Sequence, residues 1–212
     1  MEEKRKIEEV FENLQKWRGL PKYRFEERID IFLSVYLEEI LKAQIEELKD
    51  GRYEIVEIIP QFPIKKELNN QSDNTDYAVF VKDIEDEKIE LYLIELKTDK
   101  GSINGKQIKY YQKAQEKETV KIMQEIIQKI KPNSNKRAKY NNMLKLLEKK
   151  GISEESLKGN PKIIYIIPNV DVNIEKNLWK VIYFKDIIKA INKEEPIAIG
   201  LKKLMKDIIE EK

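Results

Sequence analysis

The chain contains no cysteine and no histidine among its 212 residues. The lack of cysteine excludes disulfides and thiolate metal sites. The lack of histidine excludes His-based nucleophilic triads, His-ligated zinc and an imidazole general base near neutral pH. Any catalysis must therefore use carboxylates, lysine and tyrosine, and any metal ion should be a hard cation that prefers oxygen ligands.

Long apolar runs and an excess of one charge are also missing. Lys and Arg (41) nearly balance Asp and Glu (39), so a nucleic-acid-binding face can arise only where basic residues cluster. No apolar run approaches the length of a membrane span. The charged start, MEEKRKIEEV, is followed by no apolar stretch of the kind found in signal peptides. We therefore expect a cytoplasmic protein with no membrane association.

The remaining pattern favours one α/β domain over residues 1–212, because hydrophobic residues (41%) suffice for a full core at this length. Helical spacing predicts helices over 2–17, 23–49, 106–128, 135–149, 185–192 and 196–210. Strands are expected over 53–64, 76–83, 88–98, 161–168 and 179–184. Polar residues indicate a loop over 68–75. We expect a mixed sheet flanked by helices, with a core of about 23–184 and extra helices at both ends.

A hairpin is expected where two strands flank the charged turn 84–87. If the turn is centred between Glu85 and Asp86, the numbers of paired residues sum to 171. Asp76 then lies opposite Glu95, with their Cβ atoms roughly 5 Å apart. This register depends on the turn centre, because a slip of one residue would move every side chain to the other face.

The hairpin also predicts a site. Glu95 and Lys97 share one strand face with the apolar residues 89, 91 and 93. Like charges directly opposite one another are destabilising unless a cation lies between them. We therefore expect a divalent metal ion held by Asp76 and Glu95, with Lys97 beside it. The alternative is a surface salt-bridge ladder at a strand end.

The string Asp76 … Glu95-x-Lys97, on a hairpin that follows a helix and a strand, resembles the PD-(D/E)XK nuclease superfamily. The core order of that family, αβββαβ, is the order expected for residues 23–168, and Thr75 stands at the position of the motif's Pro. The resemblance implies a restriction-endonuclease-like fold and hydrolysis of phosphodiester bonds, with DNA as the expected substrate. It also implies Mg²⁺ or Mn²⁺ held by Asp76, Glu95 and the backbone carbonyl of Leu96, and an attacking water positioned by Lys97.

Two further matches extend the resemblance. The segment Gln107-Ile-Lys-Tyr-Tyr111 resembles the Gln-x-x-x-Tyr motif of the exonuclease-like branch, which implies that this helix borders the site and that both residues orient the substrate. Family members often place a Glu on the first core helix near the metal. Glu26 is the best candidate here, because it extends the buried row of that helix, and Glu27 is the second. Ordinary helix packing and a solvated first-turn carboxylate are the alternatives.

Two other functions remain open at this point. The chain resembles a nuclease, yet a non-catalytic nucleic-acid-binding or scaffold protein of the same fold would share its element order. An unrelated helix-rich interaction protein is the third possibility. Binding of Mn²⁺ through Asp76 and Glu95 is expected only of the nuclease.

Overall fold

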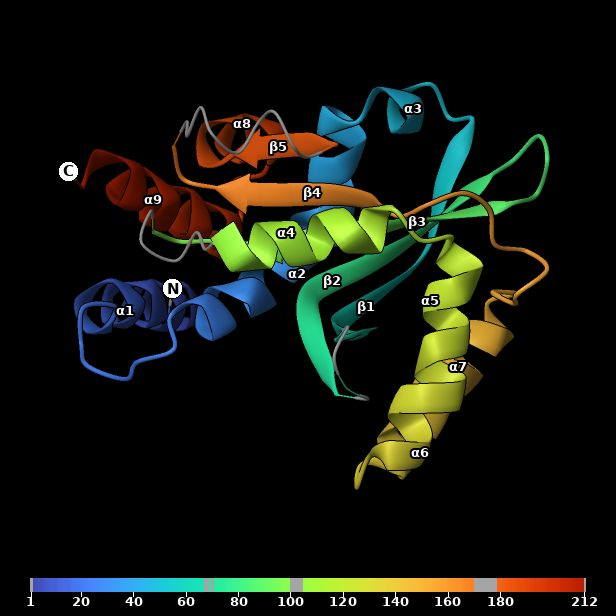
Figure 1. Ribbon diagram of the computed structural model, residues 1–212. Helices are drawn as coiled ribbons and strands as arrows, with labels where there is room; N and C mark the ends of the chain where they lie inside the picture. The colour runs from blue at the N-terminus through green and yellow to red at the C-terminus, as the bar shows by residue number, and fades with distance from the viewer. Residues whose placement is uncertain (1, 67–68, 70, 100–104, 170–178, 212) are drawn as a thin grey trace.

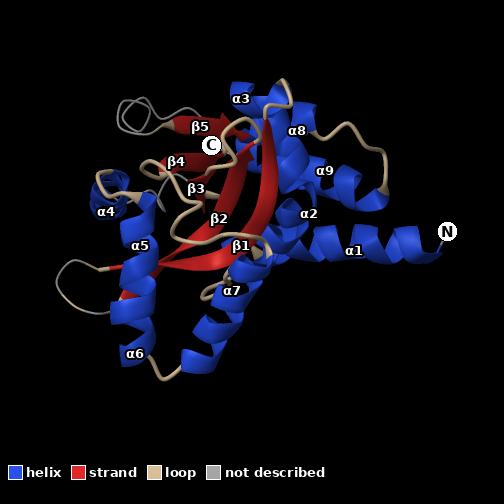
Figure 2. Cartoon of the chain, turned by 90° about the vertical axis from the view of Figure 1, so that its right-hand side faces the viewer, coloured by secondary structure: helices blue, strands red, loops and turns tan. Residues whose placement is uncertain are grey.

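The described part of the chain is organised around one sheet whose two faces are both covered by helices. The structure is a computed structural model, and it describes residues 2–66, 69, 71–99, 105–169 and 179–211. Apolar side chains line both faces of the central strands, so each face must be buried against another layer. Figure 2 shows the sheet as the middle layer between two groups of helices.

The sheet is mixed, and within the described residues it has five strands in the order β1-β2-β3-β4-β5. The first three strands, β1 (Tyr53–Lys65), β2 (Ser72–Asp83) and β3 (Ile89–Leu96), form an antiparallel meander. β4 (Lys162–Ile167) runs parallel to β3, and β5 (Lys180–Tyr183) runs parallel to β4. Figure 1 shows this arrangement. The expected α/β chain with a mixed sheet flanked by helices is confirmed.

Different helices cover the two faces of the sheet. The helical segments are α1 (Glu2–Trp17), α2 (Glu26–Gln44), α3 (Glu46–Lys49), α4 (Gly105–Gln115), α5 (Thr119–Glu125), the π-helical turn η2 (Ile126–Ile130), α6 (Lys131–Asn133), α7 (Arg137–Lys149), α8 (Phe184–Ala190) and α9 (Pro196–Glu210). One sheet face packs against α2, α8 and α9, and the other packs against α4, α5, η2 and α7. None of the described helices is both long and apolar enough to cross a membrane.

The alternation of side chains along β3 directs a charged residue into the helical layer of α4. Ile89, Leu91 and Leu93 belong to the apolar cluster on that side of the sheet, whereas Ile94 belongs to the cluster on the α2 side. Successive residues of a strand point to opposite faces, so Glu95 follows the apolar row toward α4. The predicted shared face of these residues is confirmed.

The register of the central hairpin is also as predicted. Tyr77 pairs with Ile94 and Ala78 pairs with Leu93, and the numbers of each pair sum to 171. The turn is therefore centred where the sequence placed it. One step beyond the last pair, this register brings Asp76 opposite Glu95.

Several element bounds differ from the prediction. The predicted loop over 68–75 is too long, because β2 begins at Ser72 and its first residues pair with the end of β1. The helix predicted over 23–49 is broken at Ile45, which is extended (φ −108°, ψ 119°) and only 1% exposed. The helix predicted over 106–128 is interrupted after Gln115. The helical segment also continues beyond the predicted end at 128 to Asn133, because Pro132 lies in the first turn of α6, where no backbone N–H is needed.

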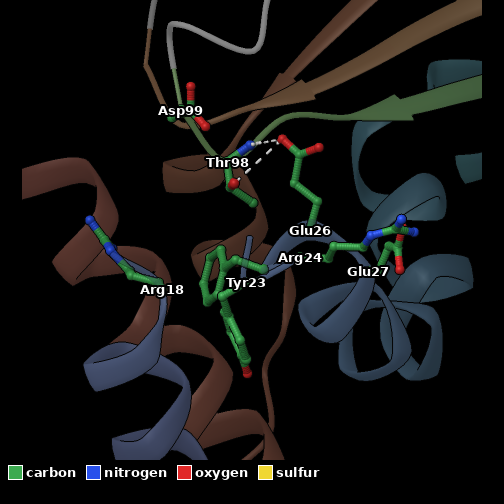
Figure 3. A pocket seen from close by; sticks show the side chains of 8 residues that line it. Arg18, Tyr23, Arg24, Glu26, Glu27, Thr98 and Asp99 are labelled. Carbon is green, nitrogen blue, oxygen red and sulfur yellow. Dashed lines mark hydrogen bonds and ion pairs between the residues drawn. The ribbon is translucent and has the colours of Figure 1, made fainter. Parts of the chain in front are cut away.

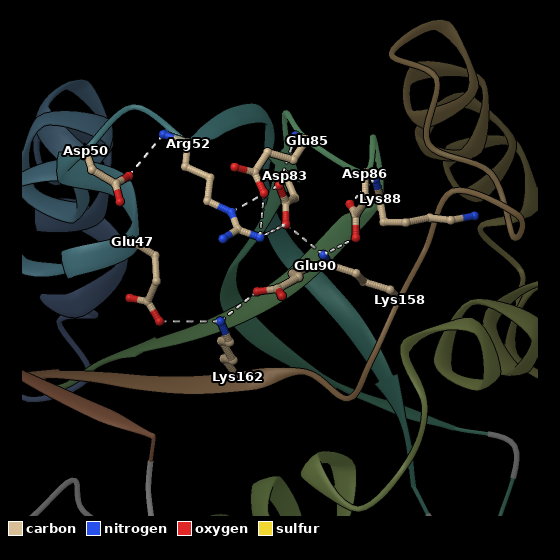
Figure 4. Close-up of polar contacts among 10 residues, drawn as sticks. All are labelled: Glu47, Asp50, Arg52, Asp83, Glu85, Asp86, Lys88, Glu90, Lys158 and Lys162. Carbon is tan, nitrogen blue, oxygen red and sulfur yellow. Dashed lines mark hydrogen bonds and ion pairs between the residues drawn. The ribbon is translucent and has the colours of Figure 1, made fainter.

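The end of the sheet near the hairpin turn is held by a buried carboxylate. Asp83, whose side chain is 1% exposed, lies 3.1 Å from Nη2 of Arg52 and 3.0 Å from Nζ of Lys158 (Figure 4). The hydrogen bond from Arg52, with that from Lys158, holds the pKa of Asp83 well below its usual range. Arg52 precedes β1 and Lys158 precedes β4, so this one side chain joins three segments of the chain.

Asp83→Asn should lower stability at neutral pH and flatten its acid dependence. The folded-state pKa of Asp83 lies below the unfolded value of about 4, so its stabilisation is complete above that pH and is lost as the pH falls toward the folded-state pKa. Thermal midpoints measured from neutral to acidic pH should fall more steeply for the wild type than for the variant. Glu9→Gln, at an exposed site, should keep the wild-type slope. Equal midpoints for Asp83→Asn and the wild type at every pH would contradict this role.

Candidate active site

Glu95 is a buried carboxylate that is fully engaged by donors from two elements. Its side chain is 4% exposed. Its Oε1 accepts hydrogen bonds from Nζ of Lys97 and Nε2 of Gln107, both at 2.6 Å, and its Oε2 accepts one from the hydroxyl of Tyr111 at 2.5 Å. Because a buried carboxylate is costly unless paired and hydrogen-bonded, these donors are what allow Glu95 to remain inside.

Lys97 lies just past the end of β3, where its backbone N–H donates to the carbonyl of Ile166 in β4 at 2.8 Å. Its ammonium is 9% exposed and also lies 3.8 Å from Glu26. Burial acts to lower the pKa of Lys97, but the charge and hydrogen bond of Glu95, with the charges of Glu26 and Asp76, outweigh it and raise the pKa. Lys97 is therefore a permanent cation and cannot act as a general base in this state.

Asp76 lies beside Glu95 and is poorly compensated by comparison. Its Oδ2 accepts the backbone N–H of Leu96 at 2.7 Å, and its Oδ1 lies 3.4 Å from Nε2 of Gln61. Burial and the negative charge of Glu95 raise the pKa of Asp76 to about 7, against the opposing effects of the Leu96 N–H and Lys97. Near neutral pH, the pair Asp76 and Glu95 is thus at the limit of carrying two negative charges.

Glu26 reaches this cluster from the first turn of α2. Its Oε1 accepts the backbone N–H of Thr98 at 3.1 Å and the hydroxyl of the same residue at 3.4 Å. Figure 3 shows Glu26 turned toward Thr98, on the wall of a cavity of about 440 Å³ that Arg18 and Tyr23 also line. Its neighbour Glu27 instead pairs with Arg24 at 2.8 Å. Of the two candidates, Glu26 is the one that the structure brings to Lys97.

Gln107 and Tyr111 lie one turn apart on α4 and face the same carboxylate, as their spacing of four predicts. Both bind Glu95 in this structure. Their expected role in orienting a substrate stays a prediction, and it would add to the role of fixing Glu95.

Three more residues lie near the cluster: Thr75, which stands at the position of the motif's Pro, and Gln61 and Tyr165, which carried no sequence signal. The Thr75 hydroxyl donates to the carbonyl of Ile94 at 2.7 Å, so it fastens β2 to β3 beside Asp76. Gln61 has a left-handed backbone (φ 52°), and its position opposite Asp76 follows only from the β1–β2 register. Tyr165 pairs with Glu95 across β3 and β4, and its buried hydroxyl has no partner among the described residues. Tyr165 could be placed beside Glu95 only from the parallel pairing of β3 with β4, which the local sequence does not indicate.

A metal ion at this cluster would depend on the free lone pairs of its carboxylates. The described residues include no group of three or more Asp and Glu side chains arranged to hold one. A carboxylate offers about four lone-pair positions. Glu95 uses three, and Asp76 uses one on each oxygen, so both residues keep free positions. A hard divalent cation fits this donor set, and it would offset the repulsion that raises the pKa of Asp76.

Comparison with known proteins adds nothing to this geometry: the chain matches no family model, no curated protein and no solved structure. Its function must therefore be inferred from the arrangement of Asp76, Glu95, Lys97 and their partners.

The two carboxylates should respond to removal in opposite ways when metal is absent. Because the folded state raises the pKa of Asp76 above its unfolded value, its charge destabilises the fold increasingly as the pH rises from about 4 to about 7. Asp76→Asn should raise the thermal midpoint in EDTA at mildly alkaline pH and leave it unchanged in acid. Glu95→Gln should lower the midpoint, by roughly 3 kcal/mol in stability, because it removes the carboxylate 2.6 Å from the buried ammonium of Lys97 and leaves that ammonium with Glu26 at 3.8 Å.

The thermal midpoint of Asp76→Asn also tells apart the two opposing influences on this carboxylate. A lower midpoint for Asp76→Asn at alkaline pH would show that the hydrogen bond from Leu96, and not the repulsion by Glu95, dominates the environment of Asp76.

Proposed function

We propose that this protein is a metal-dependent nuclease of the PD-(D/E)XK type that hydrolyses phosphodiester bonds, with DNA as its substrate. One observation carries the proposal. The carboxylates of Asp76 and Glu95 and the ammonium of Lys97 lie together at the end of the β2–β3 hairpin. Burial and the charge of Glu95 destabilise the ionised form of Asp76 there. A protein that merely needed a stable strand end would gain from replacing Asp76 by a neutral residue.

The order of elements supports the same assignment. The helix α2, the meander β1-β2-β3, the helix α4 and the parallel strand β4 follow one another in the order αβββαβ. Asp76 lies within β2, one step beyond the last β2–β3 pair, Glu95 lies near the end of β3, and α4 brings Gln107 and Tyr111 to Glu95. We take this arrangement as a restriction-endonuclease-like core.

In this proposal Asp76, Glu95 and the Leu96 carbonyl hold Mg²⁺ or Mn²⁺. When bound, the ion supplies an acidified water and positive charge next to the phosphate. The protein's own side chains do the remaining work of placement. Gln107 and Tyr111 fix the Glu95 carboxylate by hydrogen bonds, so its free lone pair points in one direction.

Lys97 and Glu26 complete the chemistry. The ammonium of Lys97 remains charged, so it orients the attacking water and stabilises negative charge that develops on the phosphate. Glu26 carries an exposed fraction of 32%, which leaves its carboxylate accessible from the adjoining cavity. From that position it can accept a hydrogen bond from the water or help to hold the metal.

A non-catalytic nucleic-acid-binding or scaffold protein of the same fold is the second candidate. The observation in its favour is that Glu95 is satisfied by protein donors alone and that the described residues contain no preformed group of three acidic ligands. The two candidates differ in whether the protein cleaves nucleic acid and whether that cleavage requires Asp76 and Lys97.

Cleavage of labelled single-stranded and duplex DNA and RNA, with Mg²⁺, Mn²⁺ or EDTA, tests the proposal. The wild type should cleave DNA with either metal and not in EDTA. Asp76→Asn should lose activity at least about a hundredfold, because it removes a metal ligand. Lys97→Met should lose activity by a similar factor, because it removes the charge that orients the water and stabilises the phosphate. Asp50→Asn, the same change at an exposed site near the opposite end of the sheet, should keep full activity. Metal-dependent cleavage that survives Asp76→Asn would refute the assignment.

Metal binding can be measured without turnover. Millimolar Mn²⁺ should raise the thermal midpoint of the wild type, because a ligand that binds only the folded state stabilises it by about 2.7 kcal/mol at a hundredfold excess over Kd. Asp76→Asn should lose this shift, whereas Lys97→Met should keep or enlarge it, since it removes a cation close to the metal. The absence of any shift in the wild type would count against the metal site.

A further inference from the structure

A second polar cavity lies between the bent end of the meander and the arm formed by η2, α6 and α7. Its volume is about 880 Å³. Figures 1 and 2 show the arm projecting beside the lower ends of β1 and β2. Gln61 and Asn74 line the cavity from the strands, and Asn135, Lys136, Lys139 and Tyr140 line it from the arm. We call it the arm groove.

Among the described residues, the lining of the arm groove is free of acidic side chains. None of its described lining residues is Asp or Glu, whereas the chain has 39 of them. The arm itself explains this. Between residues 126 and 147 the sequence has no Asp or Glu, but it has the basic residues Lys129, Lys131, Lys136, Arg137, Lys139 and Lys145. Basic residues balance acidic ones in the whole chain, so this segment is a local concentration of positive charge.

The two lysines of the arm groove are available to a ligand. Lys136, Lys139, Tyr140 and Met143 recur at helical spacing, so they share the face of the arm that lines the groove. No described carboxylate lies within ion-pair distance of Lys136 or Lys139, whereas Lys117 and Lys129 both pair with Glu125. The arm groove therefore offers two uncompensated cations to an incoming anion.

The rest of the lining is suited to unpaired bases. Five lining residues carry side-chain amides, which can donate and accept hydrogen bonds: Gln61, Gln71, Asn74, Asn133 and Asn135. Tyr140 adds a half-buried aromatic ring. Lysines for the phosphates, amides for base edges and an aromatic face for stacking are the groups that proteins use to bind single strands.

The arm groove and the candidate active site share one residue, Gln61. Gln61 lines the groove and also lies 3.4 Å from Oδ1 of Asp76. It lies opposite Asp76 across the two strands, because Pro60 pairs with Tyr77 and Phe62 pairs with Thr75. Its left-handed backbone is uncommon for a residue other than glycine and is the kind of local strain that functional sites retain. One side chain thus borders both the groove and the carboxylate.

We propose that the arm groove binds a single-stranded stretch of nucleic acid and guides it to Asp76. This inference rests on the proposed nuclease function for the direction of the strand, but the binding itself does not. A cavity of about 880 Å³ is of the size that accommodates small ligands. That volume has room for a few nucleotides of one strand.

Binding of a labelled oligothymidylate in EDTA, followed by fluorescence anisotropy at several salt concentrations, tests this proposal. Lys136→Ala/Lys139→Ala should weaken binding about tenfold or more. It should also reduce the slope of log Kd against log salt by about 1.4, or 0.7 for each lost phosphate contact on a single strand. Lys139 is an exposed residue of α7, where alanine favours helix, and Lys136 is exposed and precedes α7 without a side-chain capping hydrogen bond, so the variant should keep its thermal midpoint.

The control is Lys145→Ala/Lys149→Ala, which removes two lysines of α7 outside the arm groove and should keep the wild-type affinity and slope. Equal losses in both double variants would overturn the proposal, as would a duplex that binds as tightly as the single strand, or no binding by the wild type. The same measurement with an oligoribonucleotide shows whether the arm groove discriminates between DNA and RNA. A loss of affinity in Lys136→Ala/Lys139→Ala alone, with either strand, supports the proposal.

Cleavage assays on the same variants separate this inference from the proposed function. Groove-dependent binding by a wild type that cleaves nothing with Mg²⁺ or Mn²⁺ would sustain the arm groove and refute the nuclease. Metal-dependent cleavage of single strands that is unaffected by Lys136→Ala/Lys139→Ala would support the nuclease and refute the guiding role of the arm groove.

Discussion

The burial of the Glu95 carboxylate imposes a requirement that the surrounding elements meet. A carboxylate inside an apolar layer must be hydrogen-bonded, or its desolvation would remain uncompensated. Lys97 satisfies it from the same strand, and Gln107 and Tyr111 satisfy it from α4. The first turns of α4 are therefore tied to the end of β3. With Lys97 bound through its backbone to β4, the meander, the crossover helix and the parallel strand meet at one side chain.

Asp76 has fewer hydrogen-bond donors than Glu95. Lys97, Gln107 and Tyr111 donate their hydrogen bonds to Glu95, whereas Asp76 accepts one backbone N–H and one long contact from Gln61. The two acids are thus unequal: Glu95 is a fixed part of the fold, whereas Asp76 is held at the cost of electrostatic repulsion. Such inequality is common at sites where an ion or a substrate is expected to relieve it.

Much of this arrangement follows from local sequence, and the remainder has a physical reason for being hidden. The turn at 84–87 fixed the hairpin register, so the encounter of Asp76 with Glu95 was predictable, and the spacing of Gln107 and Tyr111 placed both on one helical face. Tyr165 was not predictable as a neighbour of Glu95, because the register of a parallel pair is set by contacts far apart in sequence. Residues 72–75 were predicted as a loop because they are polar. They form a strand instead because β1 pairs with their backbone, and that pairing is not visible in the local sequence.

The prolines of β1 have a consequence for how the molecule meets copies of itself. β1 and β5 are the outer strands of the described sheet. A free strand edge is a template on which another chain can add, and short strands, prolines and bulges weaken it. β5 has only four residues, while β1 is interrupted by a bulge near Val56 and by Pro60 and Pro63, which lack an N–H to donate. Both borders of the sheet are thus poor templates for intermolecular β-pairing, which protects a thirteen-residue strand that would otherwise invite aggregation.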